Sequence, residues 1–71
     1  MMPIIVSGYL KIKSGRRYDF LKQSLESVAL ARAHSDCEDF AVSPDLVDED
    51  RVNSFEKWQS QEALDAFRES G

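Results

Sequence analysis

The fold is decided by residues 51–64, which read RVNSFEKWQSQEAL. Residues 51–58 alternate with a period of two, which is typical of a β-strand. The alternation places two sets of side chains on opposite faces: Val52, Ser54, Glu56 and Trp58 on one, and Asn53, Phe55 and Lys57 on the other. A strand over 51–58 is therefore predicted, with the polar Ser54 and Glu56 on the same face as Trp58.

A helix is predicted directly after this strand, from residue 61 to about residue 70. Ser60 is a good N-cap, and Glu62 lies in a first turn where negative charge is favourable. Gly71 stands where a helix C-cap is expected. The apolar residues that share one side of this helix are Ala63, Leu64 and Phe67.

Two further strands are predicted upstream. Residues 3–13 are β-branched and aromatic and carry apolar side chains on both faces, so this strand needs cover on both sides. Residues 37–43 alternate weakly and precede Pro44, which cannot donate to a ladder and so places this strand at a sheet edge. The acidic residues 48–50 form a turn before the strand at 51–58. On the first strand, Ile4, Val6, Leu10 and Ile12 share one face, and Ile5 and Tyr9 share the other.

Residues 16–33 show the spacing of an amphipathic helix that joins the first two strands. Ser14 and Gly15 form a turn before it and are candidates for its cap. The apolar stripe predicted for this helix comprises Tyr18, Leu21, Leu25, Val28 and Ala29.

The resulting order, β-α-β-β-α, predicts an α+β fold with the ferredoxin-like split βαβ pattern. The full pattern ends in one more strand, for which this sequence has no counterpart. Residues 1–71 therefore form a single domain that we expect to be C-terminally incomplete. The apolar first strand keeps an open edge, which favours pairing. A C-terminal segment or a partner chain could cover that edge, or it could be blocked in some other way.

Composition excludes several classes of protein. The net charge is −4 and the sequence pI is about 4.8, which argues against nucleic-acid binding. The first apolar run, residues 4–6, is too short for a signal peptide or a spanning helix, so we expect a cytoplasmic protein without membrane contact. With one cysteine, Cys37, and one histidine, His34, no disulfide scaffold and no metal site is expected.

A folded chain of this mass exposes roughly 4,500 Å² of surface, which is marginal for a chain that must stabilise a core on its own.

The chain resembles the antibiotic biosynthesis monooxygenase family, and its quinol-monooxygenase-like members in particular. The resemblance runs from about Ile4 to Phe67. It rests on the segment 43–51, on Ala31-Arg32 and Cys37, and on a Glu-x-Trp that ends the third strand before Glu-Ala-Leu opens a helix: Glu56, Trp58, Glu62, Ala63 and Leu64.

The resemblance implies an antiparallel sheet with two helices on one face, and a homodimer whose sheets pack into an αβ-barrel. It also implies that the protein oxidises a small aromatic, phenolic or quinol-like molecule with O₂ and without metal or flavin. The polar candidates for catalysis are Glu56 and Ser54. The candidates for the substrate pocket are Trp58, Gly8, Leu64 and Phe67.

Each of these candidates has a structural alternative. Trp58 is equally a core aromatic whose N–H finds a partner, and Glu56 could simply form an ion pair. Phe67 stands where many relatives have a histidine, which removes a proton carrier. Gly8 and Arg68 match the positions of the Asn and His that haem-degrading relatives need, so haem degradation is excluded. A non-catalytic dimeric αβ-barrel that binds a small apolar ligand is therefore the alternative function.

Overall fold

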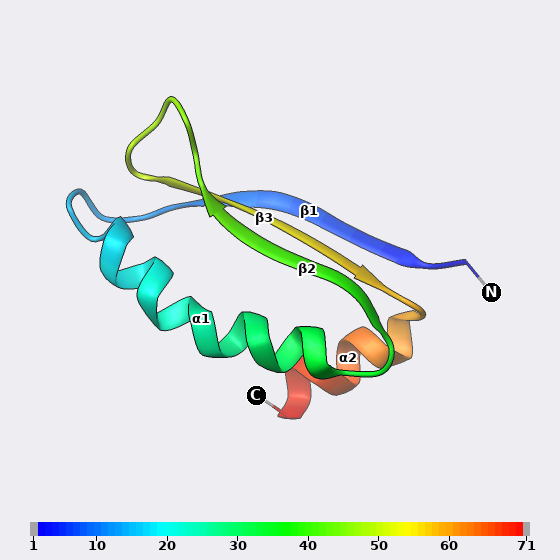
Figure 1. Ribbon diagram of the computed structural model, residues 1–71. Coiled ribbons are helices and arrows are strands. Elements are labelled where there is room, and N and C mark those ends of the chain that lie inside the picture. Colours follow the sequence, from blue (N-terminus) through cyan, green and yellow to red (C-terminus); the bar gives the residue numbers. More distant parts are fainter. Residues whose placement is uncertain (1, 71) are drawn as a thin grey trace.

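The structure is a computed structural model that describes residues 2–70, and it has the predicted element order (Figure 1). The elements are β1 (Ile4–Lys11), α1 (Arg17–Ala33), β2 (Cys37–Pro44), β3 (Arg51–Trp58) and α2 (Gln61–Ser70). The α+β class and the ferredoxin-like arrangement of an antiparallel sheet with two helices are confirmed. The candidate C-cap at residue 71 lies outside the described residues.

The three strands form an antiparallel sheet in the order β1-β3-β2, with β3 in the centre. Pro44 pairs with Val52 at the end of β2, so β2 lies at an edge as its proline requires. Among residues 2–70 no strand lies beyond the outer edge of β1. The register sets Gly8 opposite Ser54 and Ile4 opposite Trp58, which places the site candidates of β1 and β3 side by side.

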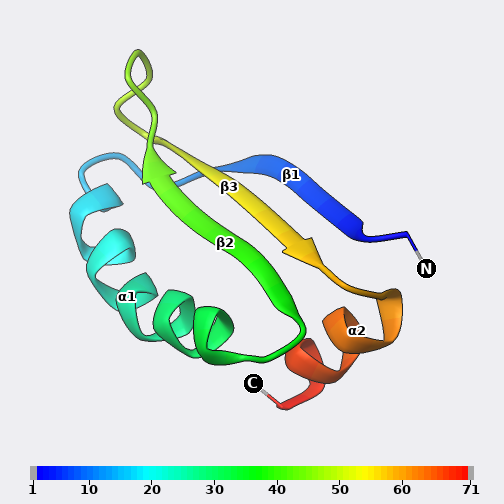
Figure 2. The same ribbon diagram turned by 45° about the vertical axis from the view of Figure 1, so that its right-hand side comes forward.

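Both helices lie on the same side of the sheet, with α1 along β2 and α2 near the end of β3 (Figure 2). The core between the layers contains Trp58, Leu64, Ala31 and Ala63, all buried. Packed against it are Ile4, Val6, Cys37, Phe40 and Phe67. On the other face of the sheet, Ile5 is 57% exposed and Tyr9 is 55% exposed. Within this chain, β1 is thus covered only in part: Ile4 and Val6 are half-buried on the side of the helices, whereas Leu10 on the same face is 52% exposed.

The two helices differ in how their N-termini are capped. Ser60 Oγ accepts the backbone N–H of Ala63 at 3.1 Å, which confirms the predicted N-cap of α2. The predicted turn at Ser14 and Gly15 is present, and Gly15 has a φ of 79° that glycine adopts without strain. Neither residue caps α1, because its N-cap is Arg16, which makes no side-chain cap bond.

The stripe predicted for α1 is wrong in part. Tyr18 is 76% exposed and Leu25 is 70% exposed, whereas Ala31 is fully buried. Tertiary hydrogen bonds from two arginines set the rotation of the helix. At its start Arg17 donates to backbone carbonyls of the β2–β3 loop, and at its end Arg32 Nε donates to the carbonyl of Phe40 at 2.8 Å. The packed face is therefore centred on Leu21, Ser24, Val28 and Ala31.

Candidate active site

Glu56 and Trp58 form a hydrogen-bonded pair on the helix-covered face of β3. Trp58 Nε1 donates to Glu56 Oε1 at 3.0 Å. The two residues are two positions apart on one strand, so their side chains leave the same face. Trp58 is fully buried, whereas the side chain of Glu56 is 16% exposed. The pair thus links a core residue to a carboxylate that solvent still reaches.

The second oxygen of this carboxylate faces α2. Arg68 Nη2 lies 3.8 Å from Glu56 Oε2, and the Arg68 side chain is 54% exposed. Glu56 therefore has the ion-pair partner that its structural alternative requires, while the carboxylate stays within reach of solvent. This role of Arg68 was not predicted from the sequence. The signal was the four-residue spacing from Leu64, which puts both residues on the same side of α2.

Trp58 and three further rings form an aromatic cluster at the buried end of the pair. Phe67 lies against Trp58 with 5.0 Å between ring centroids, and Phe40 meets Phe67 edge to face at 6.0 Å. His34 contacts the edge of Trp58 at 5.5 Å and that of Phe67 at 6.4 Å. The two pocket candidates from α2 and β3, Phe67 and Trp58, are thus in direct contact.

His34, the only histidine in the sequence, is half-buried. It occupies the C-cap position of α1, and its Nδ1 accepts the backbone N–H of Asp36 at 3.2 Å. The chain turns inward after this point because Cys37 packs against the core as β2 begins. This turn carries the imidazole against Trp58.

Gly8 and Ser54 lie next to each other on neighbouring strands. Ser54 Oγ donates to the carbonyl of Gly8 at 3.5 Å, a long hydrogen bond. A Cβ built on Gly8 would have no heavy atom within 4 Å, so the space above this glycine is open. Alternation along β1 directs that position to the helix-covered face, the face that carries Val6 and Glu56. Ser54, Gly8 and Glu56 therefore lie on one face of the sheet, beside the aromatic cluster.

Leu64, like Trp58, is a pocket candidate that lies wholly in the core. It is 2% exposed and packs with Trp58, Ala31 and Ala63. The six predicted residues therefore fall into two neighbouring groups. Trp58, Leu64 and Phe67 form a packed apolar wall, and Ser54, Gly8 and Glu56 lie on the more open part of the sheet.

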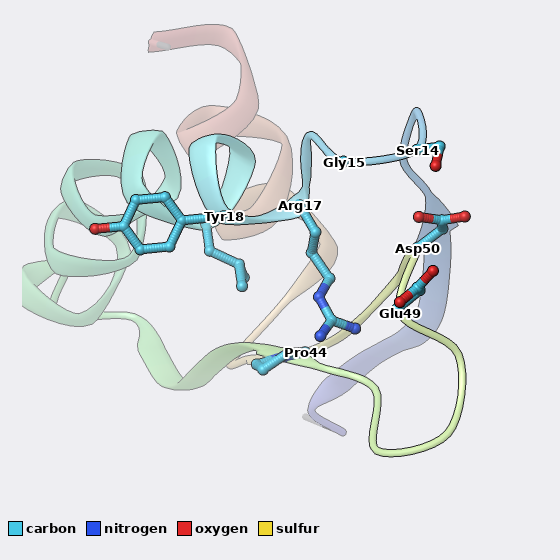
Figure 3. Close-up of a pocket in the computed structure, with 8 residues that line it drawn as sticks. Ser14, Gly15, Arg17, Tyr18, Pro44, Glu49 and Asp50 are labelled. Atoms are coloured by element: carbon cyan, nitrogen blue, oxygen red, sulfur yellow. The ribbon is translucent and has the colours of Figure 1, made fainter.

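Three concave regions do not include Glu56. A recess of about 430 Å³ lies between the start of α1 and the β2–β3 loop, where the Arg17 side chain extends toward Pro44 (Figure 3). A second region of about 490 Å³ runs along α1 beside Val42, with Leu21, Leu25 and Val28 in its walls. A third, of about 320 Å³, includes two of the predicted site residues; it is lined by Ser7, Gly8, Ala41, Ser43, Arg51, Asn53, Ser54 and Phe55.

Cys37 and the acidic residues do not form an obvious reactive centre. Cys37 is a half-buried free thiol, and burial raises its pKa, so it is not an activated nucleophile. Within residues 2–70, no group of three or more His, Cys, Asp or Glu side chains is placed to hold a metal ion. Neither helix in this part of the chain has the length and hydropathy needed to cross a membrane.

Comparison with known proteins gives one match. Residues 3–71 match the model of a protein family described as antibiotic biosynthesis monooxygenase. No curated protein and no solved structure matched the chain. The family match covers all the elements that build the Glu56–Trp58 region.

Proposed function

Because this chain belongs to the antibiotic biosynthesis monooxygenase family, we propose that it is a cofactor-independent monooxygenase of small aromatic, phenolic or quinol-type molecules, and that it works as a homodimer. The observation that carries this proposal is the Glu56 carboxylate, which accepts the N–H of the buried Trp58 at 3.0 Å and is only 16% exposed.

The proposed reaction needs no reductant other than its substrate. A phenol with a free ring position para to its hydroxyl reacts with O₂ to give a quinone and water. A hydroquinone with a free ring carbon reacts with O₂ to give a hydroxyquinone and water. In both reactions one oxygen atom enters at the free ring carbon, and the other leaves as water with two hydrogen atoms of the substrate. All the electrons that reduce O₂ come from the ring.

The residues of the site would assist this chemistry in two ways. A carboxylate such as Glu56 can accept the phenolic proton, and the resulting electron-rich phenolate is the species that reduces O₂. The guanidinium of Arg68 places positive charge near the oxygen on which negative charge develops. Ser54 offers a hydroxyl for orienting the substrate, and the rings of Trp58 and Phe67 offer an apolar wall.

The proposed homodimer is supported by the amount of exposed surface. The chain exposes 5360 Å², which exceeds the roughly 4,500 Å² usual for its mass by about the ~800 Å² that one partner buries in a standard interface. Ile5 and Tyr9 are more than half exposed on the face of the sheet without helices. A second sheet packed on that face would give β1 its other cover.

The alternative function is that of a non-catalytic dimeric αβ-barrel protein that binds a small apolar molecule. Two observations favour it. Phe67 stands where the family resemblance leads us to expect a histidine, and its ring fills the space between His34, Phe40 and Trp58. Glu56 is also engaged by Arg68, which is the arrangement of a structural carboxylate.

Oxygen uptake separates the two functions. The purified chain is mixed with a panel of hydroquinones and polycyclic phenols in the presence of a chelator, and O₂ consumption is followed with an electrode. A monooxygenase consumes O₂ in proportion to the substrate added. If no compound raises O₂ uptake above its autoxidation rate while a compound still quenches Trp58 fluorescence, the binding function is correct and the proposed activity is wrong.

A further inference from the structure

The concave region of about 320 Å³ opens on the face of the sheet that carries no helices, and we refer to it as the hollow. Both helices lie on the other side of the sheet (Figures 1 and 2). Residues 51, 53 and 55 alternate along β3 with the residues that face the helices, and cross-strand partners share a face. The lining side chains on this face belong to Ser7, Ala41, Ser43, Arg51, Asn53 and Phe55. The volume lies at the lower end of the range of small-ligand pockets, roughly 300–1,000 Å³.

Arg51 is the one charged residue in the lining of the hollow, and its guanidinium is fixed in orientation. Its Cζ lies 3.9 Å from the centroid of the Tyr9 ring, so one face of the planar group rests on an aromatic ring. Its Nε donates to Asn53 Oδ1 at 2.7 Å, and Asn53 Nδ2 in turn donates to Asp45 Oδ1 at 2.9 Å. A guanidinium held in this way loses little conformational freedom when it binds a ligand.

The two Nη groups of Arg51 make no hydrogen bond to any residue from 2 to 70. The internal partners of this arginine lie at its Nε instead, where Asp45 Oδ1 approaches to 3.6 Å. Asp45 offsets part of the positive charge, but its Oδ2 already accepts the backbone N–H groups of Val47 and Asp48. The pair of Nη groups is therefore left for an external acceptor, and a carboxylate can accept two parallel hydrogen bonds from it.

The remaining side chains of the hollow suit the rest of such a ligand. Ser7 and Ser43 are exposed, and their hydroxyls make no hydrogen bond within residues 2–70, so both can bond to a polar group of a ligand. Phe55 is half-buried and offers an apolar surface for a planar ring. The small side chain of Ala41 leaves room beside it. A molecule that joins a carboxylate to an aromatic ring matches both parts of the lining.

We propose that the hollow binds a small aromatic carboxylate, with the carboxylate on the Nη groups of Arg51 and the ring against Phe55. This site is separate from the proposed active site, because Glu56 lies on the other face of the sheet with Trp58. The inference rests neither on the proposed activity nor on the homodimer, since all these residues belong to one chain. A second sheet packed on this face would enclose the bound molecule.

The first test titrates the isotope-labelled wild-type chain with benzoate and follows its nitrogen–proton NMR spectrum. The Nε–H signal of Arg51 and the side-chain amide signals of Asn53 should shift and reach saturation, because both groups lie at the proposed contact. Benzamide has the same ring and a similar shape but no charge, and it should bind at least about tenfold more weakly. No saturable shift with benzoate, or equal affinity for benzamide, would overturn the proposal.

A second test removes the pair of Nη groups and keeps the charge. Arg51→Lys should weaken benzoate binding by about tenfold or more. The matched control is Arg32→Lys, because Arg32 also donates through its Nε, to the carbonyl of Phe40, but lies on α1 outside the hollow. The control should bind benzoate as the wild type does. Wild-type affinity in Arg51→Lys would show that the guanidinium does not hold the carboxylate.

A third variant fills the hollow and leaves Arg51 in place. Ser7→Phe puts an aromatic residue at an exposed strand position, where such residues are favourable, so the fold should be intact by circular dichroism. Benzoate binding should be lost. A Ser7→Phe variant that still binds benzoate with wild-type affinity would place the ligand elsewhere and contradict the proposal. O₂ uptake is measured separately, so the failure of this site and the failure of the proposed activity are distinguishable.

Discussion

Trp58 Nε1 and Glu56 Oε1 lie 3.0 Å apart on one strand. The only tryptophan of the chain thus orients Glu56, the one carboxylate among the predicted site residues. Because the indole is buried in the core, its N–H group has a fixed position, and it holds the carboxylate oxygen there. The other carboxylate oxygen remains directed at Arg68 of α2 and at solvent. This fixed orientation underlies the predictions below.

Replacing Glu56 with Gln tests its role as the proton acceptor. The amide keeps an oxygen that can accept the Trp58 N–H but cannot take up a phenolic proton. We expect kcat to fall by about 10²-fold or more, with little change in stability by urea denaturation. Steady-state O₂ uptake is the measurement, and Glu62→Gln on α2 serves as the control. A Glu56→Gln variant with wild-type kcat would mean that the carboxylate is structural.

Substitution of Trp58 should cost stability as well as any activity. The indole is fully buried against Leu64, Ala31 and Ala63, so Trp58→Ala leaves a cavity and is expected to lower the free energy of unfolding by about 3–5 kcal/mol. Trp58→Phe keeps most of the packing but removes the N–H donor, and we expect a loss of about 2 kcal/mol. Urea denaturation followed by circular dichroism measures both. A loss below about 0.5 kcal/mol for either variant would show that the indole is not a core residue.

Asp45 makes the stability of the β2–β3 loop, residues 45–50, depend on pH. The Asn53 side chain and the backbone N–H groups of Asp48 and Val47 lower the pKa of Asp45 to about 2, from about 3.9 in an unfolded chain. A depressed pKa in the folded state stabilises the protein above the unfolded value, and this contribution is lost as the pH falls through the folded value. Asp45→Asn should therefore be less stable than wild type at neutral pH.

The difference in Tm between the two proteins should shrink as the pH falls from about 4 toward 2. Thermal unfolding at a series of pH values measures it, with Asp65→Asn on α2 as the comparison. A difference in Tm that stays constant down to the lowest pH would show that the carboxylate charge of Asp45 does not stabilise the β2–β3 loop.

Much of this fold could be predicted because local signals agree with the tertiary structure. The alternation from Arg51 to Trp58, the Ser60 cap and Pro44 at the sheet edge each have a local cause, and the strands and helices lie within one or two residues of their predicted bounds. The pairing of Glu56 with Trp58 follows from the same alternation, since residues two apart on a strand share a face.

The rest depends on contacts between distant residues. The rotation of α1 is set by Arg17 and Arg32, which bond to carbonyls of the β2–β3 loop and of β2 and carry no periodic signal. The inward position of His34 follows from the turn into β2. The ion pair between Arg68 and Glu56 depends on where α2 packs along β3, and the sequence pattern does not specify that position.

The proposed activity is tested most directly by the fate of the oxygen atoms. The chain is incubated with isotopically heavy O₂ and the substrate that gives the highest O₂ uptake, and the product is analysed by mass spectrometry. A monooxygenase places one heavy oxygen atom in each molecule of quinone and releases the other as water. A product without heavy oxygen, formed together with hydrogen peroxide, would contradict the proposal, because the protein would then transfer electrons to O₂ without inserting oxygen.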